Sequence, residues 1–210
     1  MDILSALVAE LERGDDEKVA ELTRGAIAQN LAPRDILDHG LIAGMNVVGE
    51  KFRTREIFLP DVLMAAKAMY AGMDLLKPLL AKDGVPTRGR VVLGTVQGDL
   101  HDIGKQLVGI MLRGAGFEVI DLGHDVAPAR FVAAVKELQP AVLGLSTLLT
   151  TTMPVMRKVV TLLKEEGLAG HVKTIVGGAP VSAEFAREIG ADSYGYDAAN
   201  AVERVSALVS

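Results

Sequence analysis

The stretch that decides the fold is RVVLGTVQGDLHDIGKQLVG, residues 90–109. Its first part, residues 90–96, is a short run of apolar and β-branched residues, which predicts a buried strand. Apolar residues recur at helical spacing from Ile103 onward, and Asp102 is placed to cap the helix that begins there. His101 is therefore expected on a loop that joins a strand to a helix.

The rest of the second half repeats this alternation of strand and helix. We expect strands over residues 90–96, 117–122, 141–146, 172–177 and 192–194, with helices between them and after the last. Such alternation predicts right-handed crossovers and a parallel sheet covered on both faces. The predicted fold is an α/β doubly wound, five-stranded, Rossmann-like sheet in the flavodoxin-type order 2-1-3-4-5. Sheets of this kind bind ligands outside the carboxyl ends of their strands.

The first half of the chain has only helical periodicity. Helices are expected over residues 2–12, 15–30, 33–51 and 60–81. Phe58, Leu63 and Met64 have a spacing typical of residues that pack inside a helical bundle. The predicted fold of this half is therefore an α-helical bundle.

A change in composition separates the two halves. The segment AKDGVPTRGR, residues 81–90, interrupts the helical pattern with glycine and proline. We therefore predict a helical domain over residues 1–83, a linker over residues 84–88 and an α/β domain over residues 89–210.

Composition excludes several classes of protein. The 210-residue chain has no cysteine, which excludes disulfides, thiolate catalysis and cysteine-based zinc sites. Asp and Glu outnumber Lys and Arg by 27 to 22, so nucleic acid is not expected as a partner. The N-terminus lacks the basic region of a signal peptide, and no apolar run approaches the ~20 residues of a membrane span. We expect a cytoplasmic protein that has no membrane partner.

Residues that could carry chemistry follow three of the predicted strands. They are Gly98, Asp99, His101 and Gly104 after the first strand, residues 146–152 after the third, and Gly177 and Gly178 at the end of the fourth. His101 and Ser146 are expected to face one crevice. A phospho-receiver domain would need an aspartate at the third strand end, and the glycine motifs of nucleotide-binding loops are absent. A single-histidine metal site remains, and it suits an ion whose other ligands come from a cofactor.

Three motifs carry a resemblance to a known family. DLHDIG at residues 99–104, STL at 146–148 and GG at 177–178 resemble the DxHxxG…SxL…GG signature of cobalamin-binding domains. The segment VVGEKFRTREIFLPDVLMAAKAM, residues 47–69, resembles the helical cap that precedes this domain in methionine synthase. The likeness covers nearly the whole chain. It is closest to the corrinoid proteins of methylamine, methanol and aryl-methyl-ether methyltransferase systems.

The resemblance implies roles for the matching residues. His101 matches the histidine that replaces dimethylbenzimidazole as the lower ligand of cobalt, and Asp99 would accept a hydrogen bond from its other ring nitrogen. Such pairing fixes the ring and raises its basicity, so proton uptake can follow the change from methyl-Co(III) to Co(I). Thr152 matches the serine that extends this relay in methionine synthase. Ser146 matches a serine near the displaced nucleotide base.

The resemblance also predicts which residues line the cobalamin site. Phe52 and Leu59 match two apolar cap residues that shield the methyl group. The other predicted cofactor-binding residues are Gly98, Asp99, His101, Asp102, Ile103, Gly104, Ser146, Leu148, Thr150, Gly177 and Gly178.

The function that the resemblance implies is that of a methyl carrier. A substrate-specific methyltransferase would load the methyl group onto Co(I), and a second methyltransferase would pass it to tetrahydrofolate or a thiol. A reductive activator of the corrinoid is a further expected partner, and the chain alone is expected to be a non-catalytic subunit. The alternatives are a cobalamin-binding sensor and a storage or delivery module. A photoreceptor cap typically has a Trp and a Glu-His pair, where this chain has no Trp and has Val62-Leu63.

Overall fold

The computed structural model describes residues 2–82 and 87–209 and forms two compact units, each of which is described by itself. The helical unit ends at Thr87 and the α/β unit begins at Arg88. Residues 83–86, which include most of the predicted linker, lie outside the described residues. The domain boundaries proposed from the sequence therefore stay predictions.

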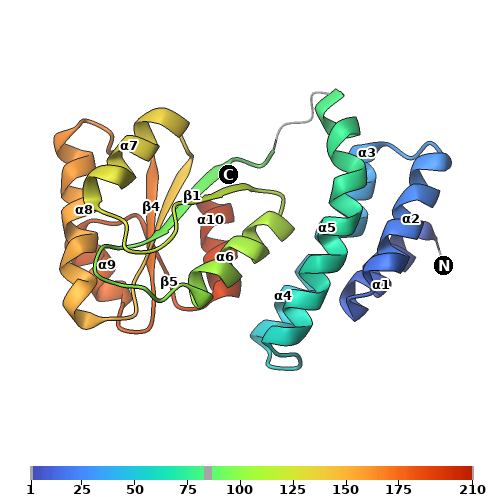
Figure 1. The fold of residues 1–210 in the computed structure, drawn as a ribbon, viewed down its shortest axis with the longest axis horizontal. Helices are drawn as coiled ribbons and strands as arrows, with labels where there is room; N and C mark the ends of the chain where they lie inside the picture. The colour runs from blue at the N-terminus through green and yellow to red at the C-terminus, as the bar shows by residue number, and fades with distance from the viewer. Residues whose placement is uncertain (1, 83–86, 210) are drawn as a thin grey trace. The chain divides into compact units, whose positions relative to one another are not determined.

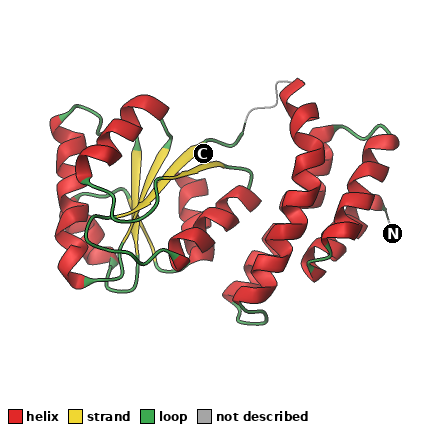
Figure 2. Ribbon diagram, viewed as in Figure 1, coloured by secondary structure: helices red, strands yellow, loops and turns green. Residues whose placement is uncertain are grey.

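The helical unit is a set of helices joined by loops (Figures 1 and 2), and capping residues mark both ends of the first helix. Asp2 caps the first helix by accepting from the N–H groups of Leu4 and Ser5, and Gly14 ends it with a φ of +72°. The elements are α1 (Ile3–Arg13), α2 (Asp16–Ala28), α3 (Pro33–Ile36), the π-helix η1 (Leu37–Ile42), α4 (Ala43–Arg53) and α5 (Leu59–Lys82).

The helix expected over residues 33–51 is helical without a break in the structure, but its first part is not regular α-helix. The structure has a short α-helix there, followed by the π-helix η1, before α4 begins. Gly40 and Gly44 lie against α1 in this region, where an added Cβ would come within 3.1 Å of Leu7 and 3.2 Å of Leu11. Apolar spacing over so few residues does not distinguish the wider π turn from an α turn.

The expectation that Phe58, Leu63 and Met64 pack inside the bundle is wrong. These side chains are 67%, 46% and 53% exposed. The buried face of α5 is formed instead by neighbouring residues such as Val62 and Ala65. Apolar residues surround most of the first turns of α5, so their spacing alone could not identify the inward face.

The α/β unit has the predicted sheet. Its five strands are parallel in the order β2-β1-β3-β4-β5, with Ser146 paired to Thr95 on one side and to Gly177 on the other. Gly177 pairs in turn with Gly195. The strands are β1 (Arg90–Thr95), β2 (Glu118–Asp121), β3 (Val142–Ser146), β4 (Lys173–Gly177) and β5 (Ser193–Gly195).

Helices cover both faces of the sheet (Figure 1). One face packs against α7 (Pro128–Leu138), α8 (Met153–Glu165) and α9 (Ala183–Ile189), and the other against α6 (Ile103–Gly114) and α10 (Ala198–Leu208). Phe131 and Met156 anchor the first of these layers in a core with Val92 and Leu143. Burial of this apolar surface fixes the sheet, whose carboxyl edge then carries the loops of the site.

No helix within residues 2–82 and 87–209 combines the length and apolar character needed to cross a membrane.

Candidate functional site

The histidine loop, residues 96–102, joins β1 to α6 at the carboxyl edge of the sheet. His101 is 54% exposed, whereas the Asp99 side chain is fully buried beside it. The Nδ1 atom of His101 lies 2.7 Å from Asp99 Oδ1, and the His101 N–H donates to the same oxygen at 2.9 Å. Thr95 donates its hydroxyl to the His101 carbonyl at 3.0 Å. The imidazole is therefore oriented by a carboxylate that solvent does not reach.

The other oxygen of Asp99 is held by the loop after β3. Asp99 Oδ2 accepts from the Thr147 hydroxyl at 2.8 Å and from the Leu148 N–H at 2.6 Å. Burial raises the pKa of the Asp99 carboxyl, but the hydrogen bonds that it accepts outweigh burial and hold its pKa far below the ordinary value. Asp99 is thus an ionised carboxylate at neutral pH.

No hydrogen bond among the described residues joins Thr152 to Asp99. The Thr152 hydroxyl is hydrogen-bonded to the Thr147 hydroxyl and to the Leu149 carbonyl, and of the two threonines it is Thr147 that reaches the carboxylate. Thr147 was not among the residues predicted from the sequence, although it directly follows the predicted third strand. Its neighbourhood contains several threonines, and only the fold shows which hydroxyl faces Asp99.

The remaining predicted residues of the histidine loop and α6 have different surroundings. The N–H of Gly98 is bound by Asp125, a residue that the sequence analysis also missed. The Asp102 carboxylate accepts from the Gln106 side chain, and the hydrogen bonds found among the described residues do not include the helix cap that was expected of it. Ile103 is 72% exposed at the start of α6.

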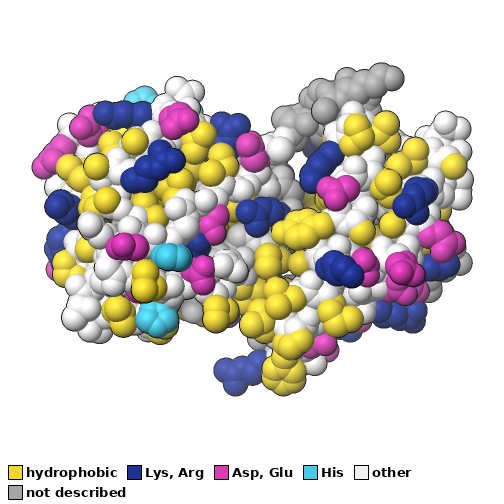
Figure 3. All heavy atoms as spheres, viewed as in Figure 1, with side chains coloured by type: hydrophobic (Ala, Val, Ile, Leu, Met, Phe, Trp, Pro, Cys, Tyr) yellow, Lys and Arg dark blue, Asp and Glu magenta, His cyan; other side chains and the backbone are white. Residues whose placement is uncertain are grey.

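Apolar side chains are exposed on the loops at the carboxyl edge of the sheet. Large hydrophobic side chains that follow β1, β3 and β5 are exposed there: Leu100, Ile103, Leu148, Leu149 and Tyr196. Figure 3 shows hydrophobic and histidine side chains exposed on the same face of the α/β unit. Thr150 is exposed in the short helix η2 (Thr150–Thr152) after β3. A half-exposed imidazole on an edge that also exposes apolar side chains fits a large, largely apolar ring that carries a central metal.

The paired glycines after β4 permit close packing of backbone against backbone. Gly178 has a φ of +126°, and a Cβ there would lie 1.7 Å from the Thr147 carbonyl oxygen. A Cβ on Gly177 would lie 2.9 Å from the Gly195 carbonyl oxygen. Gly178 therefore has a structural role, since it lets the loop that holds Asp99 approach β4.

Three further features fit a ligand that extends along the carboxyl edge of the sheet. A Cβ added to Gly104 would meet nothing within 4 Å, so nothing else in the chain requires glycine there. The Ser146 hydroxyl has no hydrogen-bond partner among the described residues. Asn200 is buried in the first turn of α10, and its Oδ1 has no partner in the described part of the chain. Open space and unpaired polar atoms are what a site for a polar cofactor tail requires.

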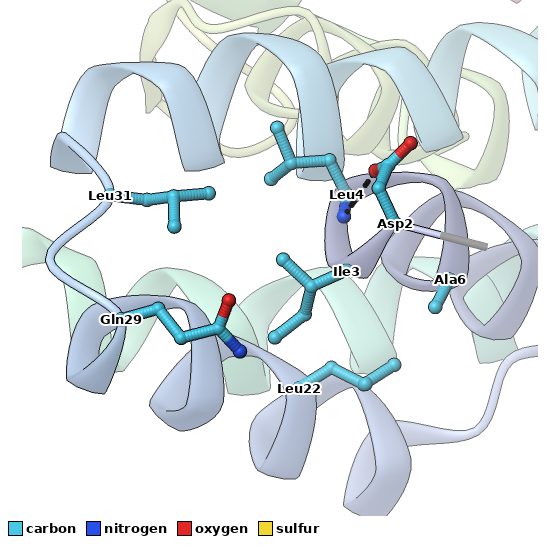
Figure 4. A pocket seen from close by; sticks show the side chains of 7 residues that line it. All are labelled: Asp2, Ile3, Leu4, Ala6, Leu22, Gln29 and Leu31. Carbon is cyan, nitrogen blue, oxygen red and sulfur yellow. Dashed lines mark hydrogen bonds between the residues drawn. The ribbon is translucent and has the colours of Figure 1, made fainter.

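A separate pocket of about 650 Å³ opens in the helical unit (Figure 4). It is lined by Asp2, Ile3, Leu4, Ala6, Leu22, Gln29 and Leu31. It contains none of the residues predicted for the cofactor site. Phe52 and Leu59 lie elsewhere in this unit, half-buried on either side of the turn between α4 and α5.

Fold and site together define a domain that binds a metal-containing cofactor at the edge of a parallel sheet. Comparison with known proteins identifies the family. The B12 binding domain matches residues 89–204, and a second B12 binding domain matches residues 3–77. Trimethylamine corrinoid protein 2 of Methanosarcina acetivorans is 46% identical over 197 residues, which are 93% of this chain and 91% of that protein.

Two solved structures extend the likeness to the fold. A cobalamin-binding protein from Desulfitobacterium hafniense is similar with a TM-score of 0.82 and 36% identity, over 99% of this chain and 98% of that chain. The methanol:cobalamin methyltransferase complex of Methanosarcina barkeri is similar with a TM-score of 0.87 and 33% identity, over 99% of this chain and 79% of the matched chain. The chain belongs to the B12-binding corrinoid proteins. Its cofactor is cobalamin.

Proposed function

We propose that this chain is a corrinoid methyl carrier in which His101 binds the cobalt of cobalamin. The orientation of the imidazole carries the proposal. Asp99 engages Nδ1 while the ring stays half-exposed, which leaves Nε2 available to a metal. Histidine ligands of metals typically donate their other ring N–H to a carboxylate, which fixes the tautomer and makes the ligating nitrogen more basic.

Asp99, Thr147 and Thr152 form a hydrogen-bonded relay behind the imidazole. With cobalamin bound, the ionised carboxylate would accept a hydrogen bond from Nδ1–H while Nε2 serves as the ligand. Release of Nε2 from the metal would leave this nitrogen free to take up a proton, and the same carboxylate would stabilise the resulting imidazolium. Thr152 acts on this pair only through Thr147.

Residues along the carboxyl edge would hold the nucleotide tail of the cofactor. Gly104 leaves open space at the start of α6, and Ser146 offers an unpaired hydroxyl at the end of β3. The buried Oδ1 of Asn200 can accept a hydrogen bond from an amide or hydroxyl group of the tail. These groups separate tail binding from cobalt ligation, so loss of His101 need not abolish cofactor binding.

Phe52 and Leu59 are proposed to shield the methyl group from water. Phe52 lies in the last turn of α4, and Leu59 begins α5 after a turn of a few residues. Both side chains are half-buried, so each keeps part of its apolar surface available to a ligand.

Bound cobalamin supplies a cobalt that accepts a methyl group and gives it up. The chain positions that cobalt and works with separate methyltransferases. Methylated amines are the first donors to test, because the trimethylamine corrinoid protein is 46% identical to this chain. A second methyltransferase that uses tetrahydrofolate or a thiol and a reductive activator complete the proposed system.

The test of cobalt ligation is His101→Ala. The purified variant should still bind cobalamin, but the absorption spectrum of the Co(III) form should shift because a nitrogen ligand is lost. His171→Ala is the matched control, since His171 is also exposed on a loop but precedes β4 and so lies away from the carboxyl edge of the sheet. An unchanged spectrum in His101→Ala would show that this histidine is not the ligand.

The test of carrier function uses the loaded protein. It should be reduced and mixed with trimethylamine, dimethylamine or methanol, each with a candidate methyltransferase, while the Co(I) spectrum is followed. Loss of the Co(I) spectrum with one donor would identify the substrate of the partner. Retention of Co(I) with every donor and partner would contradict the carrier function.

A further inference from the structure

The connection between β2 and α7, residues 122–127, lies against the histidine loop. The Thr95 N–H donates to the Gly123 carbonyl at 3.0 Å, and the Val126 N–H donates to the Thr95 carbonyl at 3.0 Å. Val96 and Val126 form an isolated parallel bridge just beyond. Pairing between these two chain segments therefore continues past the end of β2, to the point where the histidine loop begins.

Asp125 makes two hydrogen bonds from this connection to the histidine loop. Its Oδ1 accepts from the Gly98 N–H at 2.7 Å, and its own N–H donates to the Asp99 carbonyl at 3.0 Å. Asp125 has a left-handed backbone with a φ of +54°, a conformation that is unfavourable for most residues but that aspartate adopts more readily. One residue thus holds both ends of the Gly98–Asp99 dipeptide.

Asp99 is consequently held from two directions. Its carboxylate accepts from Thr147 and Leu148 on the β3 side, while its main chain is held by Asp125 on the β2 side. The same carboxylate accepts from the backbone and the ring of His101. The position of the imidazole therefore depends on where Asp99 is placed.

We propose that Asp125 is a positioning residue for cobalt ligation, an inference that rests on the proposed role of His101. Asp125 holds the Gly98–Asp99 dipeptide so that the Asp99 carboxylate presents Nε2 of His101 to the metal. Gly98 itself gives little restraint, because glycine at a φ of +86° has many accessible conformations. Without the Asp125 carboxylate, the histidine loop populates arrangements in which the imidazole is displaced.

The expected effect is on the ratio of histidine-ligated to unligated cobalt. Hydrogen bonds to a charged acceptor are stronger than neutral ones, and loss of one corresponds to a change of about five-fold or more in an equilibrium. Asp125→Gly removes the carboxylate and keeps the left-handed backbone accessible. Asp125→Asn keeps a side-chain oxygen at the same place and also tolerates this backbone.

The measurement is the electron paramagnetic resonance spectrum of each variant loaded with cobalamin and reduced to Co(II). Nitrogen splitting of the cobalt lines reports an axial nitrogen ligand, and the part of it that changes from triplets to doublets in protein labelled with ¹⁵N-histidine reports the histidine-ligated fraction. We expect clear splitting in the wild type and in Asp125→Asn. In Asp125→Gly the ratio of histidine-ligated to unligated cobalt should be at least about five-fold lower. Asp192→Ala is the control, because it removes another carboxylate that accepts a backbone N–H, that of Thr174 at 2.8 Å, and should leave the spectrum unchanged.

The outcomes separate this proposal from the one on which it rests. If the wild type shows no nitrogen splitting, cobalt ligation by His101 fails, and the role of Asp125 fails with it. If the wild type shows splitting and folded Asp125→Gly keeps it undiminished, only the positioning role is overturned. Should Asp125→Gly not fold, Asp125→Ser, whose side chain is too short to reach Gly98 in the same way, makes the same comparison.

Discussion

Gly178→Ala tests how the loop that holds Asp99 is packed. In the native backbone the new Cβ would lie 1.7 Å from the Thr147 carbonyl oxygen and 2.8 Å from its carbonyl carbon. These are backbone atoms, so no side-chain rotation relieves the overlap. Either β4 or the loop after β3 must move, and the 3.2 Å hydrogen bond from the Thr147 N–H to the Gly177 carbonyl is strained by that movement.

The cost of this substitution has two parts. A φ of +126° is unfavourable for alanine by about 1–2 kcal/mol, and overpacking costs about 1–3 kcal/mol. The free energy of unfolding should therefore fall by about 2–5 kcal/mol, which corresponds to a drop in Tm of roughly 4–20 °C for a chain of this size. The ordered contact between Thr147 and Asp99 should be weakened at the same time.

Urea denaturation followed by circular dichroism measures the free energy of unfolding of the wild type and of Gly178→Ala, both without cofactor. Gly104→Ala is the matched control because its Cβ meets nothing within 4 Å. If the free energy of unfolding of Gly178→Ala lies within about 0.5 kcal/mol of the wild-type value, the loop after β3 adjusts freely. The close packing inferred for Gly178 would then be wrong.

Three other substitutions test separate parts of the molecule. Gly104→Ala should leave the cofactor-free chain as stable as the wild type or slightly more stable, by up to about 1 kcal/mol. The same substitution should weaken cobalamin binding in a spectroscopic titration. An unchanged affinity for cobalamin would place the cofactor away from Gly104. For Asp192, burial raises the pKa of the carboxyl, but hydrogen bonds from Thr174 and Lys173 hold it below the ordinary 3.8. The stability that the Asp192 carboxylate contributes is therefore present at neutral pH and lost as pH falls below 3.8. Asp192→Ala should lower the free energy of unfolding by about 1–2 kcal/mol at pH 7 and by progressively less in acid. A difference in the free energy of unfolding that does not change with pH would exclude this linkage. If Leu59 shields the methyl group, Leu59→Ala should speed photolysis of the methylated protein with little change in Tm. A fall of about 2–5 kcal/mol in the free energy of unfolding with unchanged photolysis would instead assign Leu59 to the helical core.

The sheet could be predicted because its signals are local. Each strand is a short apolar run, and alternation with helices restricts the topology to a few possibilities. The contact between Asp99 and His101 is also local, since two residues of spacing on one loop bring them within reach. The resemblance of the motifs supplied their expected roles, and those roles stay predictions.

The missed residues act over long distances in the sequence. Asp125 contacts Gly98 across 27 positions, and Thr147 contacts Asp99 across 48. Hydrophobic periodicity contains no information about such pairs, because it identifies elements and not the loops that meet at their ends. The exposed face of α5 was missed for a related reason, since an apolar sequence does not say which of its residues a ligand or partner covers.

The loops that hold His101 follow β1, β2 and β3, which lie together on one side of the sheet order. Of the groups proposed to hold the cofactor tail, Asn200 follows β5, which is a three-residue edge strand, whereas Gly104 and Ser146 lie after β1 and at the end of β3. Short edge strands open locally at a lower free energy than the centre of a sheet. Local opening of the β5 edge would therefore displace Asn200 while the loops that hold His101 stay formed, and amide hydrogen exchange in the cofactor-free chain should be fast at β5 and slow across β1 and β3.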